Sequence, residues 1–480
     1  MDENIRVISS SPVRLQYYIP FRFDDNRFDT VSEAFSSARK DGAALWEKSR
    51  FPLGDNTFIY DHVMSLMNVR ESANSVCRSW RLAVPDSRRY AFVLSKTEEF
   101  PFSFTEVYAH LFRTGIGMLG CQVVFDCRDL TSGQLVSFQQ GIRQLRYTSR
   151  NICVLRDSPE TAGEGKDAKP AEREHAWLGG MAARLLRERT SPDIEFFGET
   201  AENRVPSAAL LFSYLCYDCP DPDALREITV HMGLGYNRQR VQSRESIQSC
   251  RELTGSVYFH VAPGGCAVSV CPNDLNRHFF VEHPPTASYH FIFFIALYQH
   301  YSLLNFTMRI STDFPSDTRA YLQNSDYADR MRDYITDIDT FLMKNDLATI
   351  SHIQYHNRFY AACREALHIE EDKQSLRSGF ESLVNIQQSI QITRQRERWH
   401  DQQEEEEKQN RRINIIAIIL AVLTVFPEFG NLLNILLTKD LKKLETSDWI
   451  SIGLFLLTLG IVAVLLVLLW RTKAPEGREK

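Results

Sequence analysis

The sequence lacks the features of secreted, nucleic-acid-binding and disulfide-stabilised proteins. Its first residues contain no apolar core of the kind found in a signal peptide, so we expect the long N-terminal part to stay in the cytosol. The formal net charge of −6 gives no support for nucleic-acid binding as the main activity. The 10 cysteines among 480 residues are scattered, which argues against a disulfide scaffold.

Motifs for catalysis and for metal binding are also scarce. No nucleophile–base arrangement, Walker loop or paired-carboxylate motif stands out, so we do not expect an enzyme. Cys216 and Cys219 form the one CxxC pair, with further cysteines downstream. A zinc site would need a second such pair or a close pair of histidines. Reduced, buried thiols and no metal site are therefore expected, and a zinc site is the alternative.

Long apolar runs are absent from the first 410 residues, but two occur near the C-terminus. Residues 413–437 carry one formal charge, that of Glu428, and residues 449–470 carry none and have a tryptophan at each end. At 1.5 Å per residue, each run can span a hydrocarbon core of about 30 Å. The sequence therefore predicts a hairpin of two transmembrane helices, which embeds the chain in a lipid bilayer and is joined by an external turn at 438–448.

Basic residues flank both ends of this hairpin. Lys408, Arg411 and Arg412 precede the first run, and Arg471 and Lys473 follow the second. The positive-inside rule places both flanks in the cytosol. We expect a multi-pass protein of the inner (plasma) membrane with both termini cytosolic and a basic tail at 471–480.

A stripe of small and polar residues runs through the first apolar segment. Its members recur at alternating spacings of three and four: Asn414, Ala417, Ala421, Thr424, Glu428 and Asn431. Such a heptad lies on one helix face, and polar groups at membrane depth require protein or water as partners. The stripe is either a helix–helix contact or the lining of a water-filled pore. Two helices per chain cannot enclose a pore, so a pore requires a homo-oligomer.

The same register continues toward the N-terminus through charged residues. Arg411, Glu407, Glu404 and Glu397 fall on it, which predicts one continuous helix from about residue 375 to 437. Around a symmetry axis these acids would concentrate cations at a pore entrance, although an arginine ring would repel them unless it pairs or turns outward. A solvated charged face is the plain alternative. The continuity of the stripe favours the pore.

These residues resemble the CorA family of divalent-cation transporters. Residues 413–427, which read INIIAIILAVLTVFP, have the character of the family's pore-lining helix, and residues 471–473 stand where its basic tail would. The resemblance implies a cytosolic α/β domain, long stalk helices, a transmembrane hairpin and a pentamer. It also implies cation conduction gated by a cytosolic ligand, with a divalent cation such as Mg²⁺ as the transported or regulatory ion.

The sequence departs from that family at its signature, Tyr-Gly-Met-Asn. Phe429-Gly430-Asn431 stands in its place without the methionine, so magnesium selectivity does not carry over. We still expect Gly430 and Asn431 to line the outer end of the pore. One alternative is the family branch found beside type III CRISPR systems, whose members act as antiviral membrane effectors activated by an adenine-nucleotide messenger. Another is a non-conducting, membrane-anchored scaffold.

The region before the hairpin alternates strand-like and helical patterns. The fold class expected is α/β, with a mixed sheet and flanking helices in a cytosolic sensor region, 1–310, followed by long stalk helices in 326–412. Residues 157–174 are typical of a loop or a domain boundary. Strands are expected at 90–94, 118–127, 151–155, 208–216 and within 255–270, and helices at 104–114, 288–305 and 326–368.

A short basic turn follows the expected helix at 104–114. Arg113, Thr114, Gly115 and Gly117 lie there. A glycine turn beside an arginine can cradle a phosphate, which makes these residues the candidate binding site for a nucleotide ligand. The alternative is a plain turn that needs glycine for its backbone angles.

Overall fold

The structure is a computed structural model, and it divides into two compact units, Met1–Val384 and Asn385–Lys480. The residues described are 3–8, 13–53, 58–70, 72, 75–84, 88–95, 98–126, 129–143, 145, 151–155, 173–199, 204–235, 247–314, 325–345, 347–438 and 446–471.

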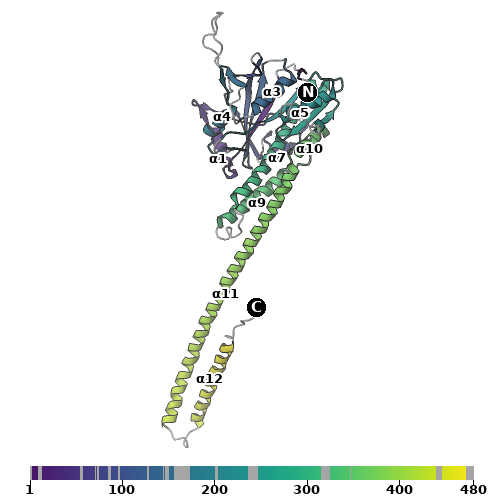
Figure 1. Ribbon diagram of the computed structural model, residues 1–480. Coiled ribbons are helices and arrows are strands. Elements are labelled where there is room, and N and C mark those ends of the chain that lie inside the picture. The colour runs from purple at the N-terminus through teal and green to yellow at the C-terminus, as the bar shows by residue number, and fades with distance from the viewer. Residues whose placement is uncertain are drawn as a thin grey trace. The chain divides into compact units, whose positions relative to one another are not determined.

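One mixed sheet forms the centre of the first unit (Figure 1). Its described part has 13 strands in the order β10-β9-β6-β7-β8-β1-β12-β15-β14-β13, with β11 paired to β1 and β5 joining β4 to β7. A separate pair consists of β2 (Arg39–Lys40) and β3 (Ala43–Ala44). The strands of the sheet are β1 (Arg14–Arg22), β4 (Trp46–Ser49), β5 (Cys77–Leu82), β6 (Arg89–Val93), β7 (Glu99–Phe112), β8 (Ile116–Phe125), β9 (Ile152–Leu155), β10 (Arg173–His175), β11 (Glu195–Phe196), β12 (Leu210–Cys216), β13 (Arg251–Thr254), β14 (Val257–Ala262) and β15 (Gly265–Val270).

Helices cover the two faces of this sheet. Those of the first unit are α1 (Phe28–Ser37), α2 (Asp61–Leu66), α3 (Ser132–Arg143), α4 (Leu178–Ala183), α5 (Pro222–Leu234), α7 (Thr286–Asp313), α9 (Ser325–Asn345) and α10 (Gln354–Ala366), with the short turns η1 (Asp25–Arg27), η2 (Arg184–Glu188) and η3 (Arg277–Glu282). Two more helices follow, α11 (Ile369–Thr438) and α12 (Thr446–Arg471).

Strand β1 is the centre of the sheet and has helices over both of its faces. It pairs antiparallel with β8 and β12, and the parallel pairing of β12 with β15 makes the sheet mixed. Successive side chains of a strand alternate between faces. On one face, the Tyr18 ring lies 5.3 Å from Phe294 of α7. On the other, Phe125 of β8 lies 4.7 Å from Phe138 of α3.

Helix α7 is buried on all its sides over its middle part. Residues 291–298 are at most 1% exposed, because the sheet lies on one side and other helices on the other. Tyr289 packs 5.0 Å from Phe359 of α10, and Tyr298 packs 6.1 Å from Phe341 of α9. A helix that is apolar all round is typical of such an enclosed position.

Most elements expected from the sequence are confirmed. The strands at 90–94, 118–127, 151–155 and 208–216 correspond to β6, β8, β9 and β12, and 255–270 folds into the hairpin β14–β15. The helix at 288–305 is α7, and the segment 326–368 forms two helices, α9 and α10. Of the expected loop at 157–174, residues 157–172 lie outside the described residues.

The expected helix at 104–114 is wrong, because this segment is the second half of β7. Residues 100, 102 and 104 alternate as buried positions, but a bulge between Phe104 and Glu106 shifts the register. From Tyr108 to Phe112 every residue is buried, because both faces of the strand are covered there. Without alternation, a buried strand cannot be told from a buried helix by its period.

Helix α11 is a single helix of 70 residues that continues through Pro427. It contains the stalk expected from about residue 375 and the whole of the apolar segment 413–437. Helix α12 contains the second apolar segment, 449–470. Where side chains in these helices are described, no helix combines the length and the apolar character needed to cross a membrane. The expected turn at 438–448 falls largely on residues 439–445, and the expected tail largely on 472–480, which lie outside the described residues.

Candidate functional site

A cavity of about 650 Å³ lies beside the central strands of the sheet. Its floor comes from alternate residues of neighbouring strands, Tyr17 and Ile19 of β1 and Leu119 and Cys121 of β8. These residues share one face because Tyr17 pairs with Cys121 and Ile19 with Leu119 in the register. Helix α4 closes one side with Met181. The volume is in the range of sites that bind small molecules and cofactors.

Tyr17 is a polar residue of the cavity lining, and its hydroxyl group is buried. Tyr17 is 1% exposed, and its hydroxyl has no hydrogen-bond partner within the described residues. Burial raises the pKa of Tyr17 well above its ordinary value, so the hydroxyl keeps its proton. Burial also raises the pKa of the Cys121 thiol to about 12. The side chains of Tyr17 and Cys121 at the floor are therefore neutral.

The rim of the cavity is basic. It carries Lys40 of β2, Arg88, Arg184 of η2 and Arg189, against the single acid Asp41. Arg184 lies 3.9 Å from Glu188, and both side chains are exposed. Four cations around an apolar cavity attract anions, and arginine binds carboxylate and phosphate oxygens in a bidentate manner.

Together these features suit a ligand with an apolar body and an anionic group. The apolar body would pack against the floor of the cavity, and the anionic group would bind the basic residues of the rim. The residues that line the cavity include no histidine and no pair of carboxylates.

The residues of the candidate turn, 113–117, contact other parts of the same unit. It joins β7 to β8, and Gly115 has a φ of +75°. The Thr114 hydroxyl lies 2.8 Å from that of Ser302, and the Thr114 carbonyl accepts a hydrogen bond from Asn305. The Arg113 guanidinium lies over the ring of Phe28, 5.0 Å from its centroid.

The remaining glycine of this turn, Gly117, lies against the ring of Phe21 on β1. With Thr114 hydrogen-bonded to α7 and the Arg113 guanidinium over the ring of Phe28 on α1, the structure favours a plain hairpin turn over a phosphate cradle at residues 113–117.

All the residues of the predicted pore lie on α11. Asn414, Ala417 and Gly430 are exposed. The side chains of Ala421, Thr424, Glu428 and Asn431 lie outside the described residues, although the helix backbone passes through them.

The residues of the predicted pore entrance also lie on α11. Glu397, Glu404, Glu407 and Arg411 are all exposed. Glu404 forms an ion pair with Lys408, one turn further along, at 2.8 Å. This pair lowers the pKa of Glu404, mainly through a hydrogen bond from the lysine.

The cysteines of the described region are free thiols. Cys216 ends β12 and Cys219 is buried, with its Sγ 3.4 Å from the carbonyl oxygen of Asp221. No cysteine belongs to a group of side chains in the described region that could hold a metal ion.

Sequence reasoning did not find the cavity. Its lining comes from segments between residues 17 and 209 that meet only in the folded sheet. Comparison with known proteins adds no relative, since no family model, no curated protein and no solved structure matches the chain.

Proposed function

We propose that the chain is a subunit of a homo-oligomeric, CorA-like membrane channel. It would conduct cations and open in response to a ligand bound in the cavity of its α/β unit. The observation that carries this proposal is the continuity of α11. This one helix begins among buried residues of the first unit, where Ile369 and Leu376 are 3% and 1% exposed, and ends in the apolar segment.

Such a helix is suited to transmit a movement. An unbroken α-helix keeps its hydrogen bonds along its whole length, so a displacement of its first turns displaces the rest. Ligand binding would repack the sheet and the helices that hold Ile369 and Leu376. The apolar segment of α11 would move in response.

The apolar surface of α11 and α12 supports a lipid environment. Large apolar side chains are exposed along both helices, and such a surface is unfavourable in water. Those described in the apolar segment of α11 are Ile413, Ile415, Ile416, Ile419, Leu420, Phe429, Leu433, Leu436 and Leu437. Those on α12 are Trp449, Ile450, Leu454, Leu456, Leu457, Leu459, Ile461, Val464 and Val467.

Two other functions fit parts of the same architecture. An antiviral membrane effector activated by an adenine nucleotide is favoured by the basic rim and apolar floor of the cavity, which suit a phosphate and a flat base. A non-conducting scaffold would use the hairpin only as an anchor.

Ion flux through reconstituted protein tests the channel. The full chain in proteoliposomes is expected to pass monovalent or divalent cations, and Glu428→Lys and Asn431→Leu should abolish the flux because both lie on the polar stripe. Leu457→Ala on α12, an exposed apolar position, should leave it unchanged. If the wild-type protein passes no ion in the presence of either Mg²⁺ or ATP, the channel proposal is wrong and the non-conducting scaffold is the function that remains.

Binding of trinitrophenyl-ATP to the full chain tests the cavity separately. This probe has a flat apolar body and several negative charges. Arg189→Glu, on the rim, should weaken its binding at least about tenfold, because it replaces an attraction by a repulsion. Arg14→Glu, an exposed position on β1 outside the cavity lining, makes the same charge change and should have little effect. Equal effects of the two variants would place the ligand elsewhere.

A further inference from the structure

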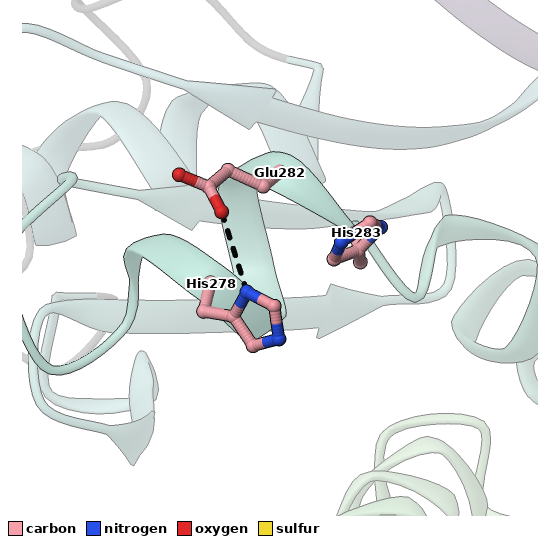
Figure 2. Close-up of side chains that lie close together, drawn as sticks. All are labelled: His278, Glu282 and His283. Atoms are coloured by element: carbon pink, nitrogen blue, oxygen red, sulfur yellow. Dashed lines mark hydrogen bonds and ion pairs between the residues drawn. The ribbon is translucent and has the colours of Figure 1, made fainter.

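A group of two histidines and one glutamate lies on the surface of the first unit, just before α7. Figure 2 shows His278, Glu282 and His283 on one short segment, η3 and the residue after it. Their nitrogen and oxygen ligand atoms all lie within 4.8 Å of one another. The Nδ1 atom of His278 is 3.3 Å from a carboxylate oxygen of Glu282.

The backbone of this segment explains why the three side chains meet. In an α-helix of 3.6 residues per turn, residue i+5 lies about 140° around the axis from residue i. Here the turn is π-helical, and the His283 N–H donates to the His278 carbonyl oxygen five residues earlier, at 3.2 Å. The wider turn brings residue i+5 back beside residue i, and single π turns are frequent at functional sites.

The segment is held firmly by the rest of the unit. The Phe280 carbonyl accepts a hydrogen bond from the Tyr214 hydroxyl at 2.9 Å. Asn276, which is 2% exposed, donates to the carbonyl oxygens of Gly255 and Cys271 at 3.0 and 2.8 Å. Two prolines directly follow His283 and restrict its backbone. Side chains on such a fixed backbone lose little freedom when they bind a ligand.

The donor set selects the kind of ligand. Two imidazole nitrogens and a carboxylate oxygen suit Zn²⁺ and similar transition-metal ions, whereas Mg²⁺ prefers oxygen ligands and water. Donors bound to Zn²⁺ at 2.0–2.2 Å in a tetrahedron lie about 3.4 Å apart, close to the separation of His278 and Glu282. All three side chains are exposed, which leaves room for water in the fourth position.

We propose that His278, Glu282 and His283 form a binding site for a divalent transition-metal ion of the Zn²⁺ class. The ion would bind the three side chains of the π turn between β15 and α7 together and so add to the contacts that hold this turn. The proposal concerns the first unit alone and does not depend on conduction.

Zinc binding by the full, purified chain tests the proposal. The protein is stripped with a chelator and titrated with Zn²⁺ against a chromophoric competitor, and Co²⁺ is added in parallel to record its visible spectrum. We expect one strongly bound Zn²⁺ per chain, a tetrahedral Co²⁺ spectrum, and binding at least about tenfold weaker in His278→Ala, His283→Ala and Glu282→Gln.

His62→Ala is the matched control, because it removes another exposed histidine of the same unit and should bind as the wild type does. The free cysteines could bind zinc instead, so the double variant His278→Ala/His283→Ala decides the outcome. Loss of the strong site in a double variant with an unchanged circular dichroism spectrum supports the proposal. Strong zinc binding that survives in the double variant, or its absence from the wild type, overturns it. Either result leaves the flux experiments unaffected.

Discussion

At the scale of single residues, two neighbouring tyrosines of β1 use their hydroxyl groups differently. The Tyr18 hydroxyl is hydrogen-bonded to Nε2 of His290 on α7. The Tyr17 hydroxyl, on the opposite face, is buried and lacks a partner in the described region. A buried polar group without a partner costs about 1–3 kcal/mol, whereas a satisfied one contributes about 1 kcal/mol.

The two tyrosines therefore form a matched pair for mutation. Tyr17→Phe should leave the free energy of unfolding unchanged or raise it by about 1 kcal/mol, because it removes an unused hydroxyl. Tyr18→Phe should lower it by about 1–2 kcal/mol, because His290 loses its partner. Urea titration of both variants measures the difference. If Tyr17→Phe lowered the free energy of unfolding more than Tyr18→Phe does, the Tyr17 hydroxyl would already have a hydrogen-bond partner.

Buried histidines should make the protein sensitive to acid. Burial lowers the pKa of His110 and of His290 to about 3, and His290 adds to the effect on His110. Both are therefore neutral in the folded protein, while an unfolded chain protonates them near pH 6.5. The resulting contribution to the free energy of unfolding is present in full above about pH 6.5 and is lost as the pH falls toward 3.

His110→Asn tests this sign. The Ser79 hydroxyl lies 2.9 Å from Nδ1 of His110. The asparagine of the variant places an amide within reach of this hydroxyl but cannot titrate. Between pH 6 and 5 its unfolding free energy should fall less steeply than that of the wild type, by about 1.4 kcal/mol per pH unit. Burial raises the pKa of Asp337 to about 6, which acts in the opposite direction, but equally in both proteins. Parallel pH profiles would contradict the prediction.

At the scale of elements, most strands and helices were predictable, including the enclosed helix α7, but the second half of one strand was not. The heptad that runs through Glu397, Glu404 and Asn414 predicted one long helix, and α11 is that helix. The strands β6, β8 and β12 were also found, although most of their residues are buried. The second half of β7 was missed because its burial comes from α7 and from neighbouring strands, so its own sequence shows no period of two.

The turn between β7 and β8 offers a test at this scale. Gly115 has a φ of +75°, and an added Cβ would lie 2.7 Å from the Phe23 carbonyl oxygen. Gly42 has a φ of +84° with no neighbour within 4 Å of an added Cβ. Gly42→Ala should cost only the strained backbone, about 1 kcal/mol, and Gly115→Ala should cost more because it adds a clash. Equal losses in chemical denaturation would show that the clash is relieved.

At the scale of the whole molecule, the two proposed sites differ in how much of each could be predicted from the sequence. The cavity depends on the pairing of β1, β7 and β8 and on the placement of η2, none of which a single sequence specifies. The metal site lies within six residues, but it needs a π turn, and α-helical spacing would separate His278 from His283. The pore hypothesis rests on a period that the sequence does contain.

The central claim is that one face of α11 lines a cation pathway, and four consecutive glutamates allow a direct test. Glu404 and Glu407 lie on the polar stripe, whereas Glu405 and Glu406 lie off it, and all four are exposed. Glu404→Gln/Glu407→Gln and Glu405→Gln/Glu406→Gln change the net charge equally. In proteoliposomes, the first pair should lower cation flux at least about threefold and the second should change it little, because only the first removes charge from the pore entrance. Equal flux in the two double variants would contradict a pathway along this face.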